Sequence, residues 1–367
     1  MADRPTFTLG IEEEYLIVHR ESRDLVREPD PAFLVACQEE IGDQVTNEFL
    51  QCQIEVGTKP HRAVPDAIAE LRSLRSCVAD AAKPFGYAPI AASTHPFSQW
   101  RDQTNTKKPR YEGLKSDLGQ AVRRMLIGGM HIHVGIEEDD LRIDLMNQMS
   151  YFLPHLLALS CSSPFWEGED TSLASYRLTV FDALPRTGLP DLLNSHAEYR
   201  RLVEHLIAAG CIEDATKIWW DIRPSDKFPT LEQRVTDVCP RLADTAAIAA
   251  LYQSLMAYLY RLKARNQRWR LYPRTVIMEN RWRAQRYGAG GKLVDHGRST
   301  LTPFATLVEE LIDLVSPEAE LLGCATELRH LREITRTGTS ADRQRKAFAE
   351  GGQDAVVDQL ITEFGES

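Results

Sequence analysis

The spacing of apolar and polar residues along the chain predicts strands and helices in an irregular succession. Alternation with a period of two, the pattern of a strand with one buried face, marks six segments. We expect strands at residues 7–18, 47–56, 87–93, 128–136, 218–223 and 230–238. Apolar positions that recur every three or four residues predict amphipathic helices. We expect helices at residues 64–82, 139–160, 191–209, 242–270, 280–286, 302–321 and 354–364, and loops at 99–115 and 162–182.

The order of these elements indicates the fold class. Strands and helices do not alternate strictly, so a parallel sheet built from βαβ units is not favoured. We expect an α+β fold, in which a mostly antiparallel sheet carries helices on one side. No linker or internal repeat divides the chain, so residues 1–367 are expected to form a single domain, with the C-terminal helix at about 350–367 peripheral.

Composition and charge exclude several classes of protein. The 43 basic and 53 acidic residues give a net charge of −10, which argues against nucleic acid as a partner. The longest apolar helical stretch, near residues 151–161, is interrupted by Pro154 and His155 and is shorter than the roughly 20 residues that span a bilayer. The N-terminus carries no apolar signal segment, and the seven cysteines form no Cys-x-x-Cys pair. We therefore expect a cytoplasmic protein with reduced thiols and no membrane span.

Paired carboxylates on the first predicted strand are the first candidate site. Glu12 and Glu14 are two residues apart, so they point to the same face, while Glu13 points to the other. Two close carboxylates with apolar neighbours repel each other, and burial adds to the cost, unless a divalent cation binds between them. A solvent-exposed edge strand is the alternative explanation.

Two further carboxylates flank the second predicted strand. Glu48 and Glu55 are seven residues apart, which places them on opposite faces of a regular strand. Both can reach one site only across a bulge or a turn. Glu55 lies between two apolar residues, which suggests that it is at the interior end of the strand.

A His-x-His pair lies on the predicted strand at residues 128–136. His131 and His133 share one strand face, a spacing that serves metal ligation in unrelated folds. A histidine on an apolar strand is otherwise often a hydrogen-bonded core residue. The flanking Gly128, Gly129 and Gly135 would let a ligand or another backbone approach closely.

Carboxylate and guanidinium groups occur together in the later segments. Glu232 and Arg234 share one strand face, where they could hold a metal ion and a phosphate, or simply form an ion pair. Arg177 ends a long aromatic and charged loop, and Arg281 lies in an arginine-rich helix. The chain has no Gly-x-x-x-x-Gly-Lys-Ser/Thr phosphate loop. If it uses ATP, carboxylate-held Mg²⁺ ions and arginines would have to neutralise the phosphates.

These motifs together resemble a known family. The segments GIEEEYLIV, NEFLQCQIEVGT, GGMHIHVG, SSPFWEGEDTSLASYR, TLEQRVTD and ENRWRAQRYG occur in this order between about Phe7 and Phe348. They are similar to the bacterial carboxylate–amine ligases of the glutamate–cysteine ligase type 2 family, in particular its YbdK-like members. The resemblance implies a glutamine-synthetase-like catalytic fold, with a curved antiparallel sheet forming one wall of an open funnel. It also implies ATP- and Mg²⁺-dependent formation of an amide bond through an acyl phosphate.

The resemblance also implies roles for individual residues. Those that match the family's metal-binding positions are Glu12, Glu14, Glu55, His131 and Glu232. Arg234 matches a contact to phosphate or acyl phosphate. Arg177 is the candidate for the γ-phosphate or the substrate carboxylate, and Glu48 for the amine substrate. His131 would also lie near the nucleotide, with His133 and Arg281 as secondary candidates for binding it.

Several alternatives remain open at this point. The reference reaction of the family joins glutamate to cysteine, but the sequence does not show which residues would select cysteine over another amine. A guanidino-kinase-like phosphotransferase and a metal-dependent hydrolase built on His131 and His133 are competing enzymes. A binding protein without turnover is a third possibility, against which the acidic residues on three strands argue. The resemblance favours a homodimer or small homo-oligomer.

Overall fold

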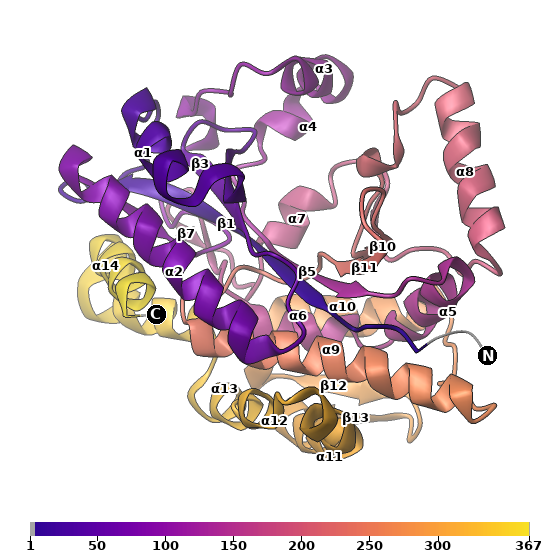
Figure 1. Ribbon diagram of the computed structural model, residues 1–367. Helices are drawn as coiled ribbons and strands as arrows, with labels where there is room; N and C mark the ends of the chain where they lie inside the picture. The colour runs from indigo at the N-terminus through magenta and orange to yellow at the C-terminus, as the bar shows by residue number, and fades with distance from the viewer. Residues whose placement is uncertain (1–3, 367) are drawn as a thin grey trace.

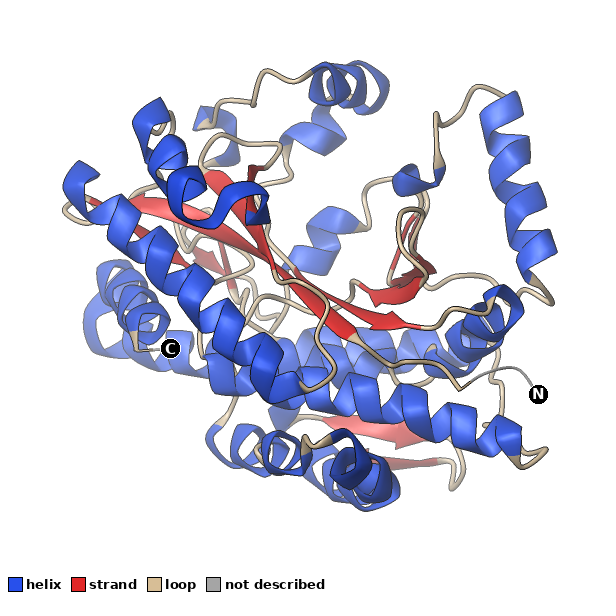
Figure 2. Cartoon of the chain, viewed as in Figure 1, coloured by secondary structure: helices blue, strands red, loops and turns tan. Residues whose placement is uncertain are grey.

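The computed structural model describes residues 4–366 of the chain, and an antiparallel sheet lies at its centre (Figures 1 and 2). The strands pair in the order β10–β11–β5–β1–β3–β2, and β4 also pairs with β1. The seven strands are β1 (Leu9–His19), β2 (Val45–Asn47), β3 (Gln53–Gly57), β4 (Tyr87–Ile90), β5 (Met130–Gly135), β10 (Ile222–Pro224) and β11 (Thr230–Gln233). Three short pairs lie outside it: β6 (Phe165–Trp166) with β7 (Glu169–Asp170), β8 (Thr187–Gly188) with β9 (Trp219–Trp220), and β12 (Lys292–Asp295) with β13 (Thr300–Pro303).

Helices form most of the rest of the described chain. They are α1 (Pro31–Ile41), α2 (Val64–Ala82), α3 (Pro109–Leu118), α4 (Gln120–Arg123), α5 (Asp139–Met149), α6 (Leu153–Ser160), α7 (Arg177–Phe181), α8 (His196–Ala208), α9 (Leu242–Ala264), α10 (Arg274–Tyr287), α11 (Phe304–Leu322), α12 (Ala325–Arg329), α13 (Leu331–Thr337) and α14 (Ser340–Gly365). None of the described helices combines the length and apolar character needed to cross a membrane.

The helices are distributed unequally over the two faces of the sheet. Helix α2 packs against β1 and α9 against β5, and α11 to α13 form a further layer beyond α9 (Figure 1). The apolar residues of β1 and β5 that face this layer, such as Ile11 and Ile132, are fully buried. Helices α3 and α4 stand over the β3 end of the opposite face, and α8 lies beyond its β10 end (Figure 1). The predicted α+β class with an antiparallel sheet is therefore confirmed.

A buried ion pair fixes β1 against the helix layer. Glu13 points to the helix side, where the Arg75 guanidinium of α2 donates to both of its carboxylate oxygens at 2.9 and 2.8 Å. Both side chains are at most 1% exposed. Tyr15 and Thr245 donate to the same carboxylate at 2.6 and 3.0 Å. Arg75 also donates to the carbonyls of Cys239 and Pro240, so one cluster joins β1, α2, α9 and the segment that precedes α9.

The segment expected as one strand at 47–56 is a hairpin. Strand β2 ends at Asn47, the chain turns at residues 48–52, and β3 begins at Gln53. Thr46 pairs with Glu55 in the antiparallel register, which places Glu48 and Glu55 on the same face. The turn that Glu48 and Glu55, seven positions apart, need in order to reach one site is therefore present.

One expected helix is broken into two, and another ends earlier than its pattern suggests. The segment 139–160 forms α5 and α6, separated at residues 150–152. Pro154 explains the break, because proline lacks an N–H and its ring clashes inside a helix, whereas the first turn of α6 accommodates it. Helix α9 ends at Ala264, and the segment that follows is irregular up to α10.

Other elements also differ from the expectation. The expected loop at 99–115 contains the start of α3, and the expected loop at 162–182 contains β6, β7 and α7. Helices α1, α12 and α13 and the β12–β13 hairpin were not expected. Helix α14 is interrupted at Gly352, where the backbone is not helical, so its second part corresponds to the helix expected at 354–364, and the part that begins at Ser340 was not expected. The second part buries Val356, Leu360 and Phe364, with the Phe364 ring 4.9 Å from that of Tyr15.

Substitution of Arg75 tests the role of the buried pair. Arg75→Met leaves the Glu13 carboxylate buried without its cation, which costs about 3–5 kcal/mol of the free energy of unfolding. Urea denaturation should show this loss. The double variant Glu13→Leu/Arg75→Met should recover much of it, because two apolar residues then replace both charges.

Arg336→Ala is the matched control, because it removes an exposed arginine that pairs with Glu333. It should cost less than about 1 kcal/mol. Equal losses for Arg75→Met and Arg336→Ala would contradict a structural role for the buried pair.

Candidate metal and phosphate site

The open face of the sheet collects polar residues from four strands, β1, β3, β5 and β11. Glu12 of β1 lies opposite His131 of β5, and Glu14 lies opposite Glu55 of β3. Glu232 of β11 lies opposite His133 of β5. Because cross-strand partners point to the same side, these side chains share one surface.

A cavity of about 510 Å³ opens on this surface. Of the candidate residues, those that line it are Glu12, Glu14, Glu48, Glu55, His131, His133, Arg177, Glu232 and Arg234. Nine of the ten candidates from the sequence therefore meet in one place, although they come from six separate segments of the chain.

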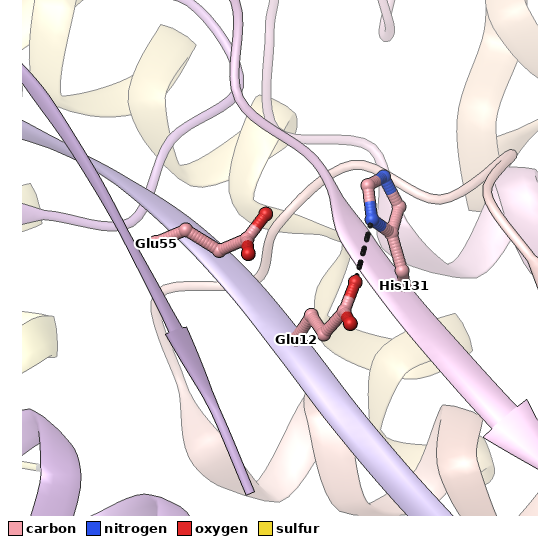
Figure 3. A group of neighbouring side chains, drawn as sticks. All are labelled: Glu12, Glu55 and His131. Carbon is pink, nitrogen blue, oxygen red and sulfur yellow. Dashed lines mark hydrogen bonds and ion pairs between the residues drawn. The ribbon is translucent and has the colours of Figure 1, made fainter. Parts of the chain in front are cut away.

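Among the described residues, three groups of these side chains could each hold a cation. They are Glu12 with Glu55 and His131, Glu12 with His133 and Glu232, and Glu14 with Glu48 and Glu55. Within each group the potential ligand atoms lie within 4.8 Å of one another. Figure 3 shows the first group, in which His131 Nδ1 lies 3.3 Å from a Glu12 oxygen. Carboxylates predominate, which suits hard divalent cations such as Mg²⁺.

His133 has the geometry of a potential ligand. Its Nδ1 lies 2.9 Å from Thr230 Oγ1, a hydrogen bond that orients the ring. Its Nε2 is buried and makes no hydrogen bond within the described chain, and it lies 3.5 Å from Glu12 Oε1. A buried nitrogen that faces a carboxylate in this way fits a metal-binding position.

The carboxylates at the β1–β3 end of the cavity repel one another. Burial and the neighbouring charge of Glu48 raise the pKa of Glu14 to about 7. Burial, followed by the charges of Glu12 and Glu48, raises the pKa of Glu55 well above its ordinary value. Binding a cation would remove this repulsion, so the donor set fits a metal ion.

Arginines surround the other end of the acidic surface. Arg223 donates to both oxygens of Glu232 at 2.9 and 3.1 Å, and Arg234 forms an ion pair with the same carboxylate. Although burial acts in the opposite direction, Arg234 and Arg223 hold the pKa of Glu232 well below its usual range. Glu232 therefore remains charged next to two guanidinium groups, which are suited to phosphate oxygens.

Arg177 lies deep in the site because a glycine makes room for it. Its side chain is 2% exposed, and its Nη2 donates to the Arg234 carbonyl at 3.1 Å. A Cβ atom on Gly129 would lie 2.4 Å from Nη2, so a residue with a side chain would displace the guanidinium. The space at Gly129 is thus filled by the Arg177 side chain, whereas the approach of another backbone expected at these glycines occurs at Gly128, where a Cβ atom would lie 3.0 Å from the Glu14 carbonyl oxygen.

Arg281 is the one candidate that lies outside the cavity lining. It donates to Asp221 at 2.7 Å and to both oxygens of Asp182 at 2.6 and 2.9 Å, and it is 2% exposed. Its position joins α10 to the end of α7 and to the segment before β10. The structure therefore gives Arg281 a packing role behind the site.

Sequence reasoning missed Arg223 and the apolar part of the lining. Arg223 lies within a predicted strand, and only its pairing with Glu232 across β10 and β11 reveals its place. The apolar residues come from loops, from α3, α4 and α7 and from β9, and most of them lie where the sequence pattern predicted no element.

The same fold occurs in solved structures that include a glutamate–cysteine ligase. A glutamate–cysteine ligase from Francisella tularensis, solved in complex with AMP, superposes with a TM-score of 0.73 over 100% of this chain and 90% of that one, at 15% identity. A bifunctional glutathione synthetase from Pasteurella multocida has a TM-score of 0.71 over 98% of this chain and 52% of its own, at 16% identity. At such identities the likeness shows a shared fold.

The chain belongs to glutamate–cysteine ligase family 2, whose family model matches residues 8–360. A Rhodospirillum rubrum protein named "Putative glutamate–cysteine ligase 2" is 56% identical, covering 98% of this chain and 96% of its own length. A protein of the same name from Ruegeria pomeroyi is 54% identical over 98% of this chain and 94% of its own. The family predicted from the sequence motifs is confirmed.

The raised pKa values predict how stability depends on pH without divalent ions. Between the ordinary value near 4.5 and the folded-state value of about 7 for Glu14, the folded protein binds more protons than the unfolded one. Stability is therefore lost as pH rises through this window. Glu55→Gln removes part of the repulsion, so its melting temperature near pH 7.5 should exceed that of the wild type by a few degrees.

This difference should vanish near pH 5, where the carboxylates of the wild type take up protons. Thermal unfolding in the presence of a chelator measures the melting temperatures at both pH values. The variant Glu39→Gln, at an exposed glutamate, is the control. A Glu55→Gln variant that is less stable than the wild type near pH 7.5 would show that these carboxylates do not repel one another.

Proposed function

We propose that the protein is an ATP- and Mg²⁺-dependent ligase that joins the carboxylate of a glutamate-like amino acid to an amine through an acyl phosphate. Glutamate and cysteine are the reference substrates of the family. One observation carries the proposal: a single sheet face holds three carboxylate-rich groups next to Arg177 and Arg234. The likeness to a ligase solved with AMP supports nucleotide binding at this fold.

In the proposed first step, an oxygen of the substrate carboxylate attacks the γ-phosphorus of ATP. The bond from this phosphorus to the bridging oxygen breaks, and ADP leaves with the electron pair. Negative charge is spread over the phosphoryl oxygens, so the protein acts mainly through positioning and electrostatics. We assign Arg177 and Arg234 to these oxygens, because both guanidinium groups border the acidic groups and are held by neighbouring backbone or side chains.

Mg²⁺ would neutralise and orient the phosphates when bound. The residues that we propose as its ligands are Glu12, Glu14, Glu55, His131 and Glu232, with His133 as a further candidate. Burial and the positive charge of Arg234 lower the pKa of His131 to about 4, so the imidazole is neutral near pH 7. A neutral imidazole has the free nitrogen lone pair that a metal ion requires.

In the proposed second step, the amine nitrogen attacks the acyl carbon. The carbon–oxygen bond to the phosphate breaks, inorganic phosphate leaves with that electron pair, and an amide forms. The nitrogen must also lose a proton, for which we propose the Glu48 carboxylate as the acceptor. Glu48 borders both the acidic surface and the remaining part of the cavity.

The remaining expectations follow from the same proposal. We propose a single catalytic domain that acts in the cytoplasm on small molecules and forms a homodimer or small homo-oligomer. Arg281 would support the site by holding α7 and the segment before β10, without contact to the nucleotide.

Phosphate release from ATP and Mg²⁺, measured across pairs of carboxylates and amines, tests the proposal. We expect release that requires both partners, because the acyl phosphate breaks down productively only with an amine. Turnover of ATP with a carboxylate alone and no amide would indicate a stalled acyl phosphate, if inorganic phosphate appears, or a kinase, if only ADP and a phosphorylated product appear. No release with any pair, together with tightly bound Zn²⁺, would favour the hydrolase.

Variants connect this activity to the site. Glu55→Gln should lower turnover by at least about 100-fold, because the residue belongs to two of the three groups. The control Glu39→Gln should retain wild-type turnover. Unchanged turnover and unchanged Mg²⁺ dependence in Glu55→Gln would show that the metal assignment is wrong.

A further inference from the structure

The cavity has two chemically different ends. Ten of its lining residues are apolar or aromatic and belong to one continuous apolar cluster, which includes residues of α3 and α4. This apolar wall consists of Phe49, Tyr111, Leu114, Leu118, Val122, Met125, Ile127, Phe181, Leu184 and Trp219. The opposite end is formed by the β10–β11 hairpin and carries Arg223, Ser225, Asp226, Lys227 and Phe228.

The apolar wall begins directly beside the acidic surface. Phe49 follows Glu48 in the turn between β2 and β3, and its ring lies 5.6 Å from that of Tyr111 on α3. Gln53, at the start of β3, donates to the Ile127 carbonyl at 2.8 Å and so closes the gap between the two surfaces. A molecule with one end at Glu48 would therefore place its other end against the wall.

The polyphosphate of a nucleotide fits the opposite end better. Arg223, Arg234 and Lys227 supply positive charge there, and Arg223 and Arg234 both contact Glu232. The Phe228 ring is 56% exposed and lies 6.3 Å from that of His133, so a nucleobase could stack on it. With ATP at this end, the apolar wall remains for the attacking amine.

We infer that the amine substrate carries an apolar body of several carbon atoms, which binds the apolar wall while its nitrogen lies at Glu48. This inference rests on the proposed ligase function and concerns its second step. As in the proposed second step, the nitrogen forms the bond to the acyl carbon, phosphate leaves, and the proton goes to Glu48. An alkyl or aryl amine, or the amino group of a large apolar amino acid, satisfies this description better than a small thiol-bearing or charged amine.

A series of primary amines tests the inference on the intact enzyme with glutamate, ATP and Mg²⁺. Propylamine, butylamine, pentylamine and benzylamine are compared with cysteine, ethanolamine and lysine by phosphate release and amide formation. We expect kcat/KM to rise roughly threefold for each added methylene, as apolar burial predicts. A preference for cysteine or for the polar amines would overturn the inference while leaving the ligase function intact.

A substitution in the apolar wall locates the amine. Leu118 is half-buried at the end of α3, so Leu118→Asn changes the polarity of the wall with little change in volume. We expect the KM for the preferred apolar amine to rise about tenfold, while the KM for ATP stays within about twofold. The conservative Leu118→Met should restore the amine KM, and Leu321→Asn, at a leucine that is 76% exposed, is the matched control.

The possible outcomes separate the two proposals. A rise in the KM for ATP with unchanged amine KM would mean that the apolar wall holds the nucleobase, which overturns the inference. Absence of amine-dependent phosphate release with every amine would instead overturn the ligase function itself. Thermal unfolding of each variant shows whether it is folded. If Leu118→Asn does not fold, Leu114→Asn provides a second substitution in the apolar wall.

Discussion

The structure depends on the register of β1, which the buried pair of Glu13 and Arg75 secures. Three consecutive glutamates occupy this strand, and side chains alternate between its faces. A slip by one residue would bury Glu12 and Glu14 among the helices and leave Glu13 alone in the cavity. Arg75 and the hydroxyl groups of Tyr15 and Thr245 satisfy a carboxylate only at position 13. The helix side thus determines which carboxylates reach the open face.

On the open face, favourable packing gives way to electrostatic repulsion. Glu14, Glu48 and Glu55 come within reach of one cation, and the cost of bringing them together is visible in the raised pKa values of Glu14 and Glu55. A protein selected for stability alone would not keep this arrangement. The helix layer and the core behind it supply the stability that allows the carboxylates to remain close. Strain of this kind is characteristic of functional sites.

Much of the site could be predicted from the sequence because strand alternation is a local property. The shared face of Glu12 and Glu14, and that of His131 and His133, follows from a spacing of two residues. The β2–β3 hairpin could not be predicted, since its turn contains neither glycine nor proline. The position of Arg281 outside the cavity lining could not be predicted for a different reason. Its partners Asp182 and Asp221 lie far away in the sequence, and only the tertiary fold brings them to it.

Some signals in the sequence were present but not used. Asp30 caps α1 by accepting from the Ala32 N–H, and Pro31 begins that helix, which is a recognised start signal. Pro154 marks the start of α6 in a segment that periodicity alone reads as one helix. The apolar wall could not be predicted, because its members come from several short segments that only the tertiary fold brings together.

The central claim is that the open sheet face binds divalent cations through shared carboxylates. Titration of metal-free protein with Mn²⁺, followed by the electron paramagnetic resonance signal of the free ion, tests it without substrate or turnover. We expect more than one Mn²⁺ ion per chain in the wild type, and fewer in Glu55→Gln, since Glu55 is common to two groups. Equal Mn²⁺ binding by the wild type and Glu55→Gln, or none by either, would contradict the account.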